Sequence, residues 1–240
     1  MVGLELGFDK YKLIIREKGR VIEVAEGLSS QLKGFKASEV YISFTCPRLV
    51  GKFYNKKVGK KEIESELGTH FEYRIAGFKT GKNTGYFFGG VEKATFLSVM
   101  DFLKSLRISK IVRLNFTPFV LLDVLSFLSV PSKVKDCLAL AFHDKFIYYV
   151  ICKEGQPQLV SSFESENWMD FVSDLVKTFF EEGLNTVFLT GEYPETAVSE
   201  LKAITDDGDV NIFNPFIEFT IATPRKFKQA AFYSALGVTL

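Results

Sequence analysis

The chain has 240 residues, of which 30 are lysine or arginine and 29 are aspartate or glutamate, so its formal net charge at pH 7 is +1. This balance argues against a nucleic acid as the main partner, because nucleic-acid-binding domains usually carry a clear basic excess. The longest apolar stretches, such as 119–122 and 146–152, are far shorter than the roughly 20 residues that span a bilayer. We therefore expect no transmembrane segment in this chain.

The start of the chain and its cysteines indicate the compartment. Met1 leads directly into a strand-like segment that contains Glu5, which is not the pattern of a signal peptide. The three cysteines, Cys46, Cys137 and Cys152, form no CxxC pair and suit a reducing environment. These features predict a soluble, cytoplasmic protein.

The first half is predicted to be an α/β unit that opens with an antiparallel meander. Alternating apolar residues between short polar turns are typical of such a meander. Apolar residues at helical spacing follow, and Thr117-Pro118 is a good start for a further helix. In chain order we expect strands at 2–7, 11–16 and 20–26, a strand at 85–91, a helix at 92–107, a strand at 110–116 and a helix from 117.

A small α+β segment is predicted to be inserted into this half. It begins with a strand at 40–45 and continues as an extended stretch at 47–57. A lysine- and glutamate-rich helix at 60–73 follows, and the chain returns at 74–79. The polar, glycine-containing sequence at 79–84 is expected to be a hinge or loop.

The same order of elements returns in the second half. An apolar strand, a tight turn and two further strands form a second meander, after which helices and strands alternate. We expect strands at 137–142, 145–153 and 158–165, a helix at 165–182, a strand at 186–191, a helix at 193–204, a strand at 210–213 and a last helix at about 224–236 that Gly237 ends as a C-cap.

A meander followed by α/β crossovers, occurring twice, resembles the actin, hexokinase and heat-shock chaperone superfamily. The resemblance implies an α/β, actin-like (ribonuclease H-like) duplicated fold with a small α+β inserted subdomain. Its first half would span 1–130, with the insertion at about 40–79, and its second half would span 131–240. The alternative is an ordinary two-domain α/β protein whose halves look alike by chance.

The first turn carries a more specific resemblance. Residues 5–13 read ELGFDKYKL, which resembles the D-I-G-S-S-S-V-K-L segment that opens PilM, the actin-like protein of type IV pilus assembly. Glu5 stands where that family has aspartate, while Gly7 and Lys12 match. In this superfamily such glycine-bearing turns cradle phosphates through backbone N–H groups. Here Phe8-Asp9-Lys10 replaces the serines of the family's segment.

The resemblance to PilM covers nearly the whole chain. The cytoplasmic domain of the type II secretion protein GspL has the same general layout, and that protein continues into a transmembrane helix. Whether this chain serves a pilus or a secretion system stays open at this point. The further matching segments are VYISFTCP at 40–47, GQP at 155–157, VFLTG at 187–191, NPF at 214–216 and AAFYSALGVTL at 230–240.

The second phosphate turn and the adenosine loop depart from the family's pattern. Ala141 and His143 replace the aspartate and glycine of the second turn, and Glu192 follows the retained Gly191 where a second glycine is usual. The resemblance therefore implies a vestigial nucleotide site that consists of Glu5, Gly7, Lys12 and Gly191. Asp144 is an alternative replacement for the lost carboxylate.

We therefore expect no catalytic residue, no cofactor beyond weakly bound ATP, and no enzyme activity. A metal site is not expected, because the two histidines, His70 and His143, have no ligands at suitable spacing. One alternative is an ATPase or small-molecule kinase of the actin and hexokinase superfamily. Another is a nuclease of the ribonuclease H type, but its two-metal chemistry needs several carboxylates, and only Glu5 stands in a suitable place.

The resemblance to PilM implies an adaptor or scaffold that is cytoplasmic and peripheral at the inner face of the inner membrane. Its partner would be an N-terminal cytoplasmic peptide of a single-span inner-membrane protein (PilN-like), with a pilus or secretion ATPase as a second candidate. The peptide would bind near the inserted subdomain. The candidate aromatic residues for this groove are Phe53, Tyr54, Phe71 and Tyr73; the equally weighted alternative is that each belongs to the core of the subdomain.

Overall fold

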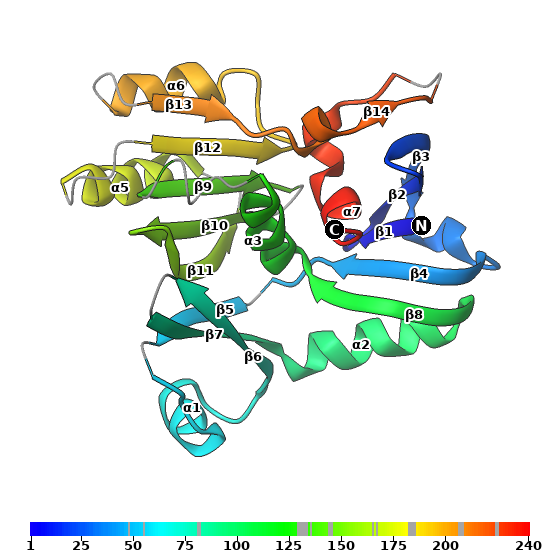
Figure 1. Cartoon of the computed structure of the whole chain (residues 1–240), viewed down its shortest axis with the longest axis horizontal. Helices are drawn as coiled ribbons and strands as arrows, with labels where there is room; N and C mark the ends of the chain where they lie inside the picture. Colours follow the sequence, from blue (N-terminus) through cyan, green and yellow to red (C-terminus); the bar gives the residue numbers. More distant parts are fainter. Residues whose placement is uncertain are drawn as a thin grey trace.

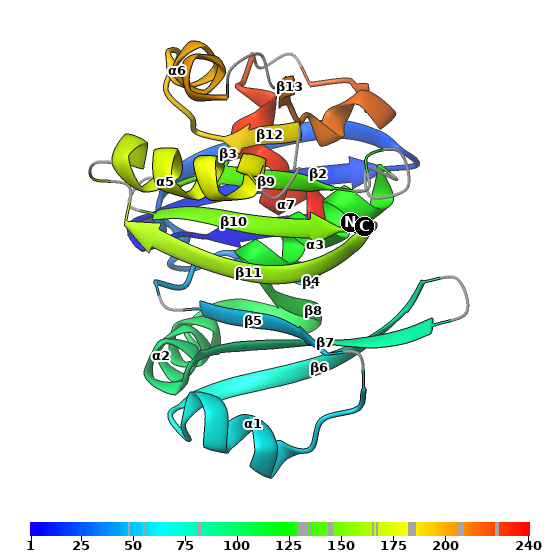
Figure 2. The same cartoon turned by 90° about the vertical axis from the view of Figure 1, so that its left-hand side faces the viewer.

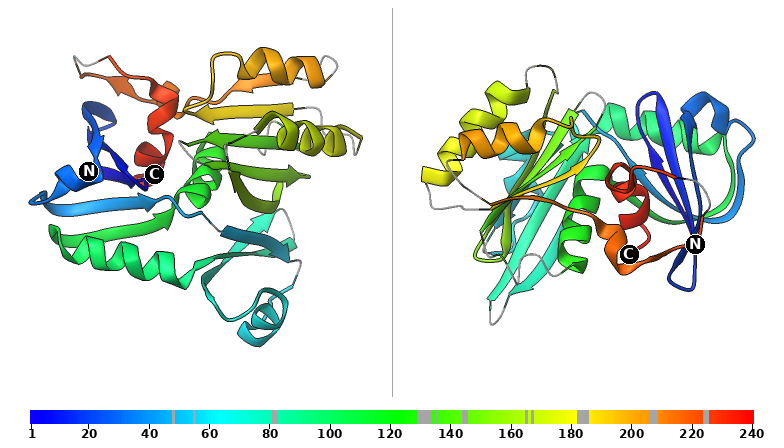
Figure 3. Two further views of the ribbon diagram at one scale, coloured as in Figure 1. Left: turned by 180° about the vertical axis from the view of Figure 1, so that it is seen from behind. Right: turned by 90° about the horizontal axis from the view of Figure 1, so that it is seen from above.

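The computed structural model describes residues 1–47, 49–54, 56–80, 83–128, 134, 136–143, 146–164, 166, 168–181, 186–205, 209–223 and 226–240, apart from the side chains at 50, 67, 73–80, 83–85, 87 and 180–181. Two β-sheets dominate the described part, and helices α3 and α7 lie between them (Figure 1 and Figure 3). Helices α5 and α6 cover the far face of one sheet, as Figure 2 shows from the side.

The first sheet has the strand order β14-β3-β2-β1-β4-β8. Strands β1, β2 and β3 form the predicted antiparallel meander, whereas β4 runs parallel to β1 and β8 runs parallel to β4. The bounds are β1 (Val2–Leu6), β2 (Lys10–Glu17), β3 (Arg20–Leu28), β4 (Lys36–Phe44), β8 (Arg107–Phe116) and β14 (Thr220–Ile221).

The second sheet has the strand order β13-β12-β9-β10-β11-β5-β7-β6. Strands β9, β10 and β11 form the second predicted meander, with β12 and then β13 added in parallel. The bounds are β5 (Leu49–Tyr54), β6 (Phe71–Thr80), β7 (Asn83–Glu92), β9 (Cys137–Phe142), β10 (Phe146–Lys153), β11 (Gln156–Glu164), β12 (Thr186–Gly191) and β13 (Asp209–Ile212).

The helices follow the predicted order. Helix α3 begins at Thr117 with Pro118 in its first turn, as the sequence predicts. The bounds are η1 (Ser29–Leu32), α1 (Lys60–Leu67), α2 (Lys93–Lys104), α3 (Thr117–Phe127), α5 (Trp168–Glu181), α6 (Ala197–Ile204), η2 (Pro215–Glu218), η3 (Gln229–Phe232) and α7 (Tyr233–Gly237).

The inserted strands share a sheet with the second half of the chain. Strand β5 pairs with β11, so that Lys52 lies opposite Leu159, and β7 and β6 extend the sheet beyond β5. The strand predicted at 40–45 instead belongs to β4, because it pairs in parallel with β1 in the first sheet. Residues 130 and 131, at the predicted division between the halves, lie outside the described residues, and that division stays a prediction.

Two boundaries within the insertion differ from the sequence expectation. The helix predicted at 60–73 ends at Leu67, because Gly68 adopts a φ of +87° that terminates the helix, and β6 begins at Phe71. The expected loop at 79–84 is mostly strand, since Thr80 of β6 still pairs with Asn83 of β7. Residues 81 and 82 lie outside the described residues.

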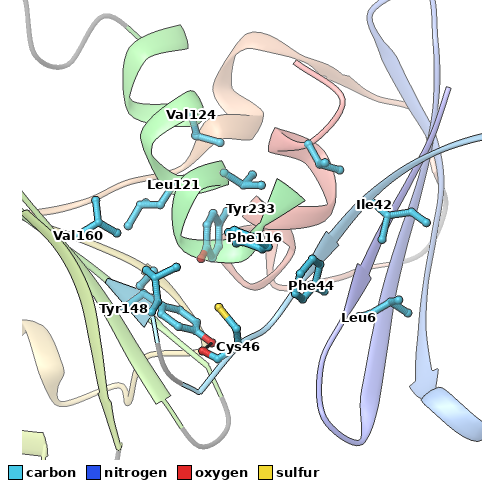
Figure 4. Packing of buried hydrophobic residues seen from close by; sticks show 14 of the residues in the cluster. Leu6, Ile42, Phe44, Cys46, Phe116, Leu121, Val124, Tyr148, Val160 and Tyr233 are labelled. Atoms are coloured by element: carbon cyan, nitrogen blue, oxygen red, sulfur yellow. Dashed lines mark hydrogen bonds between the residues drawn. The ribbon is translucent and has the colours of Figure 1, made fainter. Parts of the chain in front are cut away.

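Alternation along β9 divides the core between the two faces of the second sheet. Ala139 and Ala141 belong to the large cluster that lies between the sheets, whereas Leu138 and Leu140 pack in a second cluster under α5 and α6. Figure 4 shows the large cluster, in which Tyr148 of β10 points toward Cys46. The Tyr148 hydroxyl donates a hydrogen bond to the Cys46 carbonyl oxygen at 3.1 Å.

The last helix is shorter than predicted, and Gly237 has a different role. The segment expected as one helix at about 224–236 contains η3 and the short helix α7. Gly237 is the last residue of α7 rather than a C-cap beyond it, and it is buried against α3. A Cβ at this position would overlap Val124 and would lie 2.6 Å from Val120 Cγ1.

We expect Gly237→Ala to lower the free energy of unfolding by about 1–2 kcal/mol, because the added methyl group overpacks the contact between α3 and α7. Urea denaturation should show a lower midpoint with an unchanged slope. Ser98→Ala, at an exposed position of α2, is the control and should change the free energy by less than about 0.5 kcal/mol. Equal stability of both variants would contradict this packing.

Candidate functional site

Residues of the two meanders line a small cleft between the sheets. Glu5 and Lys12 line this cleft from the first sheet, and His143 and Glu192 line it from the second. Of the four predicted nucleotide-site residues, Glu5, Gly7 and Lys12 therefore lie together here, and Gly191 immediately precedes Glu192. The Asp144 alternative lies outside the described residues.

Lys12 lies between two carboxylates. It stands directly opposite Glu5 in the β1–β2 pairing, and its Nζ atom lies 2.8 Å from Glu192 Oε1 across the cleft. The Lys12 side chain is only 7% exposed. Burial lowers the pKa of Lys12, but Glu5 and Glu192 outweigh that effect and raise it above its ordinary value. Lys12 thus stays charged and joins the two sheets.

Glu5 also contacts the second sheet through His143. His143 Nδ1 lies 3.3 Å from Glu5 Oε1, and His143 Nε2 lies 2.9 Å from the Tyr233 hydroxyl. A proton on Nδ1 can be donated to Glu5, in which case Nε2 accepts the hydrogen bond from Tyr233. Burial raises the pKa of Glu5, but Lys12 and His143 outweigh it and hold that pKa below its ordinary value.

Gly191 positions Glu192 for this contact. Its φ is +84°, a conformation that favours glycine, and a Cβ would overlap the Phe142 carbonyl oxygen. The next residue, Glu192, donates its backbone N–H to that same oxygen at 2.8 Å. The glycine predicted from the adenosine loop therefore allows the end of β12 to lie close to β9, with the Glu192 side chain turned toward Lys12.

An aromatic contact narrows the cleft further. The rings of Phe8 and Phe146, which both line it, have their centroids 5.3 Å apart. The remaining cavity is about 40 Å³, whereas pockets for small organic ligands are about 300–1,000 Å³. Such a volume has room for a few water molecules.

Two of the four predicted docking aromatics, Phe53 and Tyr54, pack in different places. Phe53 packs against the large cluster between the sheets, whereas Tyr54, next to it on β5, packs beside Val58, Ile63 and Phe88. The Tyr54 hydroxyl also donates a hydrogen bond to Glu66 Oε2 at 2.7 Å.

The other two aromatics lie on the neighbouring part of the insertion. Phe71 is half-buried, with its ring centroid 4.5 Å from that of His70. The Tyr73 side chain lies outside the described residues. The assignment of these aromatics to peptide binding stays a prediction.

A larger cavity, which the sequence did not indicate, lies between α2 and the β1–β2 turn. Its volume is about 460 Å³ and none of its described lining residues is charged. The Thr45 and Ser29 hydroxyl oxygens are buried there without a hydrogen-bond partner among the described residues. The lining, which we call the uncharged cavity, consists of Leu6, Gly7, Phe8, Ser29, Thr45, Ala94, Thr95, Ser98, Val99 and Phe102.

Sequence reasoning missed the uncharged cavity because its residues come from four separate segments. Val99 is one of the apolar residues at helical spacing in α2, and it packs against the core. The sequence feature that could have indicated the cavity is the group of small side chains in the first half of the helix, Ala94, Thr95 and Ser98. Larger side chains at these positions would fill the space.

Within the described segments, no helix has both the length and the apolar character to cross a membrane. Over the same residues, no three His, Cys, Asp or Glu side chains are grouped as a metal site would require.

Comparison with known proteins gives structural relatives only. No family model matches the sequence, and no curated protein does. The structure resembles the PilM–PilN type IV pilus biogenesis complex, with a TM-score of 0.74 and 14% identity over 99% of this chain and 96% of that chain.

Two other solved structures are also similar. One is the cytoplasmic domain of EpsL, an inner-membrane component of the type II secretion system of Vibrio cholerae, with a TM-score of 0.52 and 12% identity over 99% of this chain and 93% of that one. The other is a Bacteroides thetaiotaomicron protein with an actin-like ATPase fold, with a TM-score of 0.58 and 17% identity over 89% and 91% of the two chains. The chain therefore has the actin-like fold that its sequence predicted.

We expect Glu5→Gln to lower the free energy of unfolding at pH 7 by about 3 kcal/mol, because a buried charge network loses one member. The folded-state pKa of Glu5 lies below its unfolded value. Its contribution is therefore present above the unfolded pKa, at about 4.3, and is lost as the pH falls through the folded pKa.

Urea unfolding of both proteins at several pH values should thus show a stability difference that shrinks in acid. The control is Glu39→Gln, which removes the exposed Lys110–Glu39 ion pair and should leave stability nearly unchanged. A difference for Glu5→Gln that does not vary with pH would contradict the assigned charge of Glu5.

Proposed function

We propose that the chain is a cytoplasmic adaptor at the inner face of a bacterial inner membrane, in a type IV pilus or type II secretion assembly. It binds a short cytoplasmic peptide of a single-span membrane protein and does not turn over nucleotide. One observation carries this proposal: the chain's own side chains fill its inter-sheet cleft, while an open, uncharged cavity lies beside it.

The charges of the cleft do not suit a nucleotide. The buried ammonium of Lys12 lies between Glu5 and Glu192 and already contacts Glu192, and Asp9 and Lys10 also line the cleft. A phosphate group would have to break that ion pair and approach both carboxylates, which costs free energy unless a metal ion intervenes. Ala141 lies where the family's metal-handling aspartate is expected. These features support a vestigial nucleotide site and a non-enzymatic role.

Isothermal titration with ATP and magnesium is expected to show a dissociation constant weaker than about 1 mM, and phosphate release should not exceed the background. The matched control is Lys12→Met, which removes the ammonium group that contacts Glu192 across the cleft. Micromolar, magnesium-dependent binding that Lys12→Met abolishes would favour the alternative of an ATPase or small-molecule kinase.

The uncharged cavity has the chemistry of a peptide site. Its apolar wall, which includes Phe102 and Val99, can accept one or two apolar side chains. The unpartnered hydroxyls of Thr45 and Ser29 can hydrogen-bond to peptide amide groups. A buried charge would have no partner there, so the segment that enters the cavity is uncharged.

The position of the cavity suits the proposed partner. Thr45 directly follows β4, before the inserted strands, and Ala94 lies in the first turn of α2, after them. The cavity therefore lies at the base of the insertion, near the subdomain to which the resemblance assigned peptide binding. The likeness to a PilM–PilN complex supports a PilN-like membrane protein as the source of the peptide, and a pilus or secretion ATPase is a second proposed partner.

Synthetic N-terminal peptides of single-span membrane proteins encoded beside this gene are the probes. We expect one to bind with a dissociation constant of about 1–10 μM. Ser98→Glu places a charge at the rim of the cavity and should weaken binding at least about tenfold. Leu97→Glu is the matched control, because Leu97 is exposed on the same helix and does not line the cavity.

The same titration tests the predicted aromatic surface. If binding survives Ser98→Glu but is lost in a folded Phe53→Ala or Tyr54→Ala variant, the peptide binds on the insertion itself. If no peptide binds the unaltered protein, the adaptor proposal is wrong.

A further inference from the structure

The inter-sheet cleft and the uncharged cavity share a wall. Gly7, Phe8 and Thr45 line both spaces. We call these residues the shared wall. Any change in the cleft that moves the shared wall therefore also changes the shape of the cavity.

The first sheet fixes the backbone of this wall by itself. The Gly7 N–H donates to the Lys10 carbonyl oxygen at 2.8 Å, and the Thr45 N–H donates to the Leu6 carbonyl oxygen at 2.8 Å. The Phe8 side chain is different, because it is 44% exposed and its ring contacts Phe146 of the second sheet. Its position thus depends on the distance between the sheets.

Two polar contacts also connect the two sheets at this cleft. Lys12 reaches Glu192 at 2.8 Å, and Glu5 reaches His143 at 3.3 Å. We call these two polar contacts the cleft bridge. Three of the four polar residues are almost fully buried, so water screens these interactions little.

We propose that the cleft bridge controls the affinity of the uncharged cavity for its peptide, with Phe8 as the residue that transmits the effect. The inference rests on the proposed function, because it assigns a regulatory contact to the same cavity. When the bridge is formed, Phe146 holds the Phe8 ring as a wall of the cavity. When the bridge opens, Phe8 loses its support and the peptide loses a contact surface. By linkage, a bound peptide stabilises the bridge to the same extent.

The first experiment measures peptide affinity in bridge variants of the full chain. Glu192→Ala should weaken binding by about fivefold or more, since coupling between sites is commonly of that size. Glu192→Gln, which can still accept a hydrogen bond from Lys12, should have a smaller effect. Lys110→Met is the matched control, because it removes the exposed 2.8 Å pair with Glu39 far from the cavity and should leave affinity unchanged.

A double-mutant cycle separates transmission through Phe8 from general destabilisation. Phe8→Ala alone should weaken binding, and Glu192→Ala should then add little, because the ring that carries the effect is gone. Strictly additive effects of the two changes would overturn the role of Phe8.

A second experiment needs no peptide. Thr45 is 6% exposed and the three native cysteines are at most 1% exposed, so the thiol of a Thr45→Cys variant should react slowly with a maleimide. Adding Glu192→Ala should speed this labelling about fivefold or more. The native cysteines, followed by mass spectrometry, should stay unlabelled, which distinguishes local opening from global unfolding.

The outcomes distinguish the two proposals. If no peptide binds but Glu192→Ala speeds labelling at position 45, the cleft bridge controls the accessibility of the shared wall, and the proposed peptide-binding function is wrong. If peptide binds and Glu192→Ala changes neither affinity nor labelling, the adaptor function stands and the bridge proposal is overturned.

Discussion

One buried ammonium group connects the two sheets at the cleft between them. Lys12 of the first sheet faces Glu5 on the neighbouring strand and reaches Glu192 of the second sheet. A buried charge that loses a partner costs several kcal/mol, so this group favours the sheets staying in contact at the cleft. The narrow cavity beside it, the contact of Phe8 with Phe146 and the position of His143 are all consistent with that constraint.

Local patterning made the architecture predictable, but it did not reveal which sheet the insertion joins. Alternation and turns indicated both meanders, and Thr117-Pro118 indicated the start of α3. The pairing of β5 with β11 could not be predicted, because the local sequence of a strand does not specify which distant strand pairs with its edge. Gly237 was misassigned because a glycine near a helix end usually terminates it, and here contact with α3 decides instead.

The candidate site was partly predictable in the same sense. The sequence indicated Glu5, Lys12 and Gly191 as residues of a nucleotide site and showed that Glu192 carries a charge there. It related each residue to a bound nucleotide and not to the other residues of the site. Their contacts with one another depend on how the two sheets are placed, which no local pattern encodes. The same holds for His143. The sequence indicated only that His143 replaces the glycine of the second phosphate turn, whereas the fold places it between Glu5 and Tyr233.

The shared sheet also has a consequence for the order in which the chain can fold during synthesis. Strand β5 leaves the ribosome early, but its partner on one side, β11, is made only after β7, α2, β8 and α3. Until residues 156–164 emerge, that edge of β5 is unpaired, and unpaired strand edges in nascent chains favour aggregation. The lysine at position 52 on this edge opposes pairing with other chains, since charged residues on strand edges disfavour such contacts. Completion of the second half therefore ends the period in which a nascent chain is most exposed to misassembly.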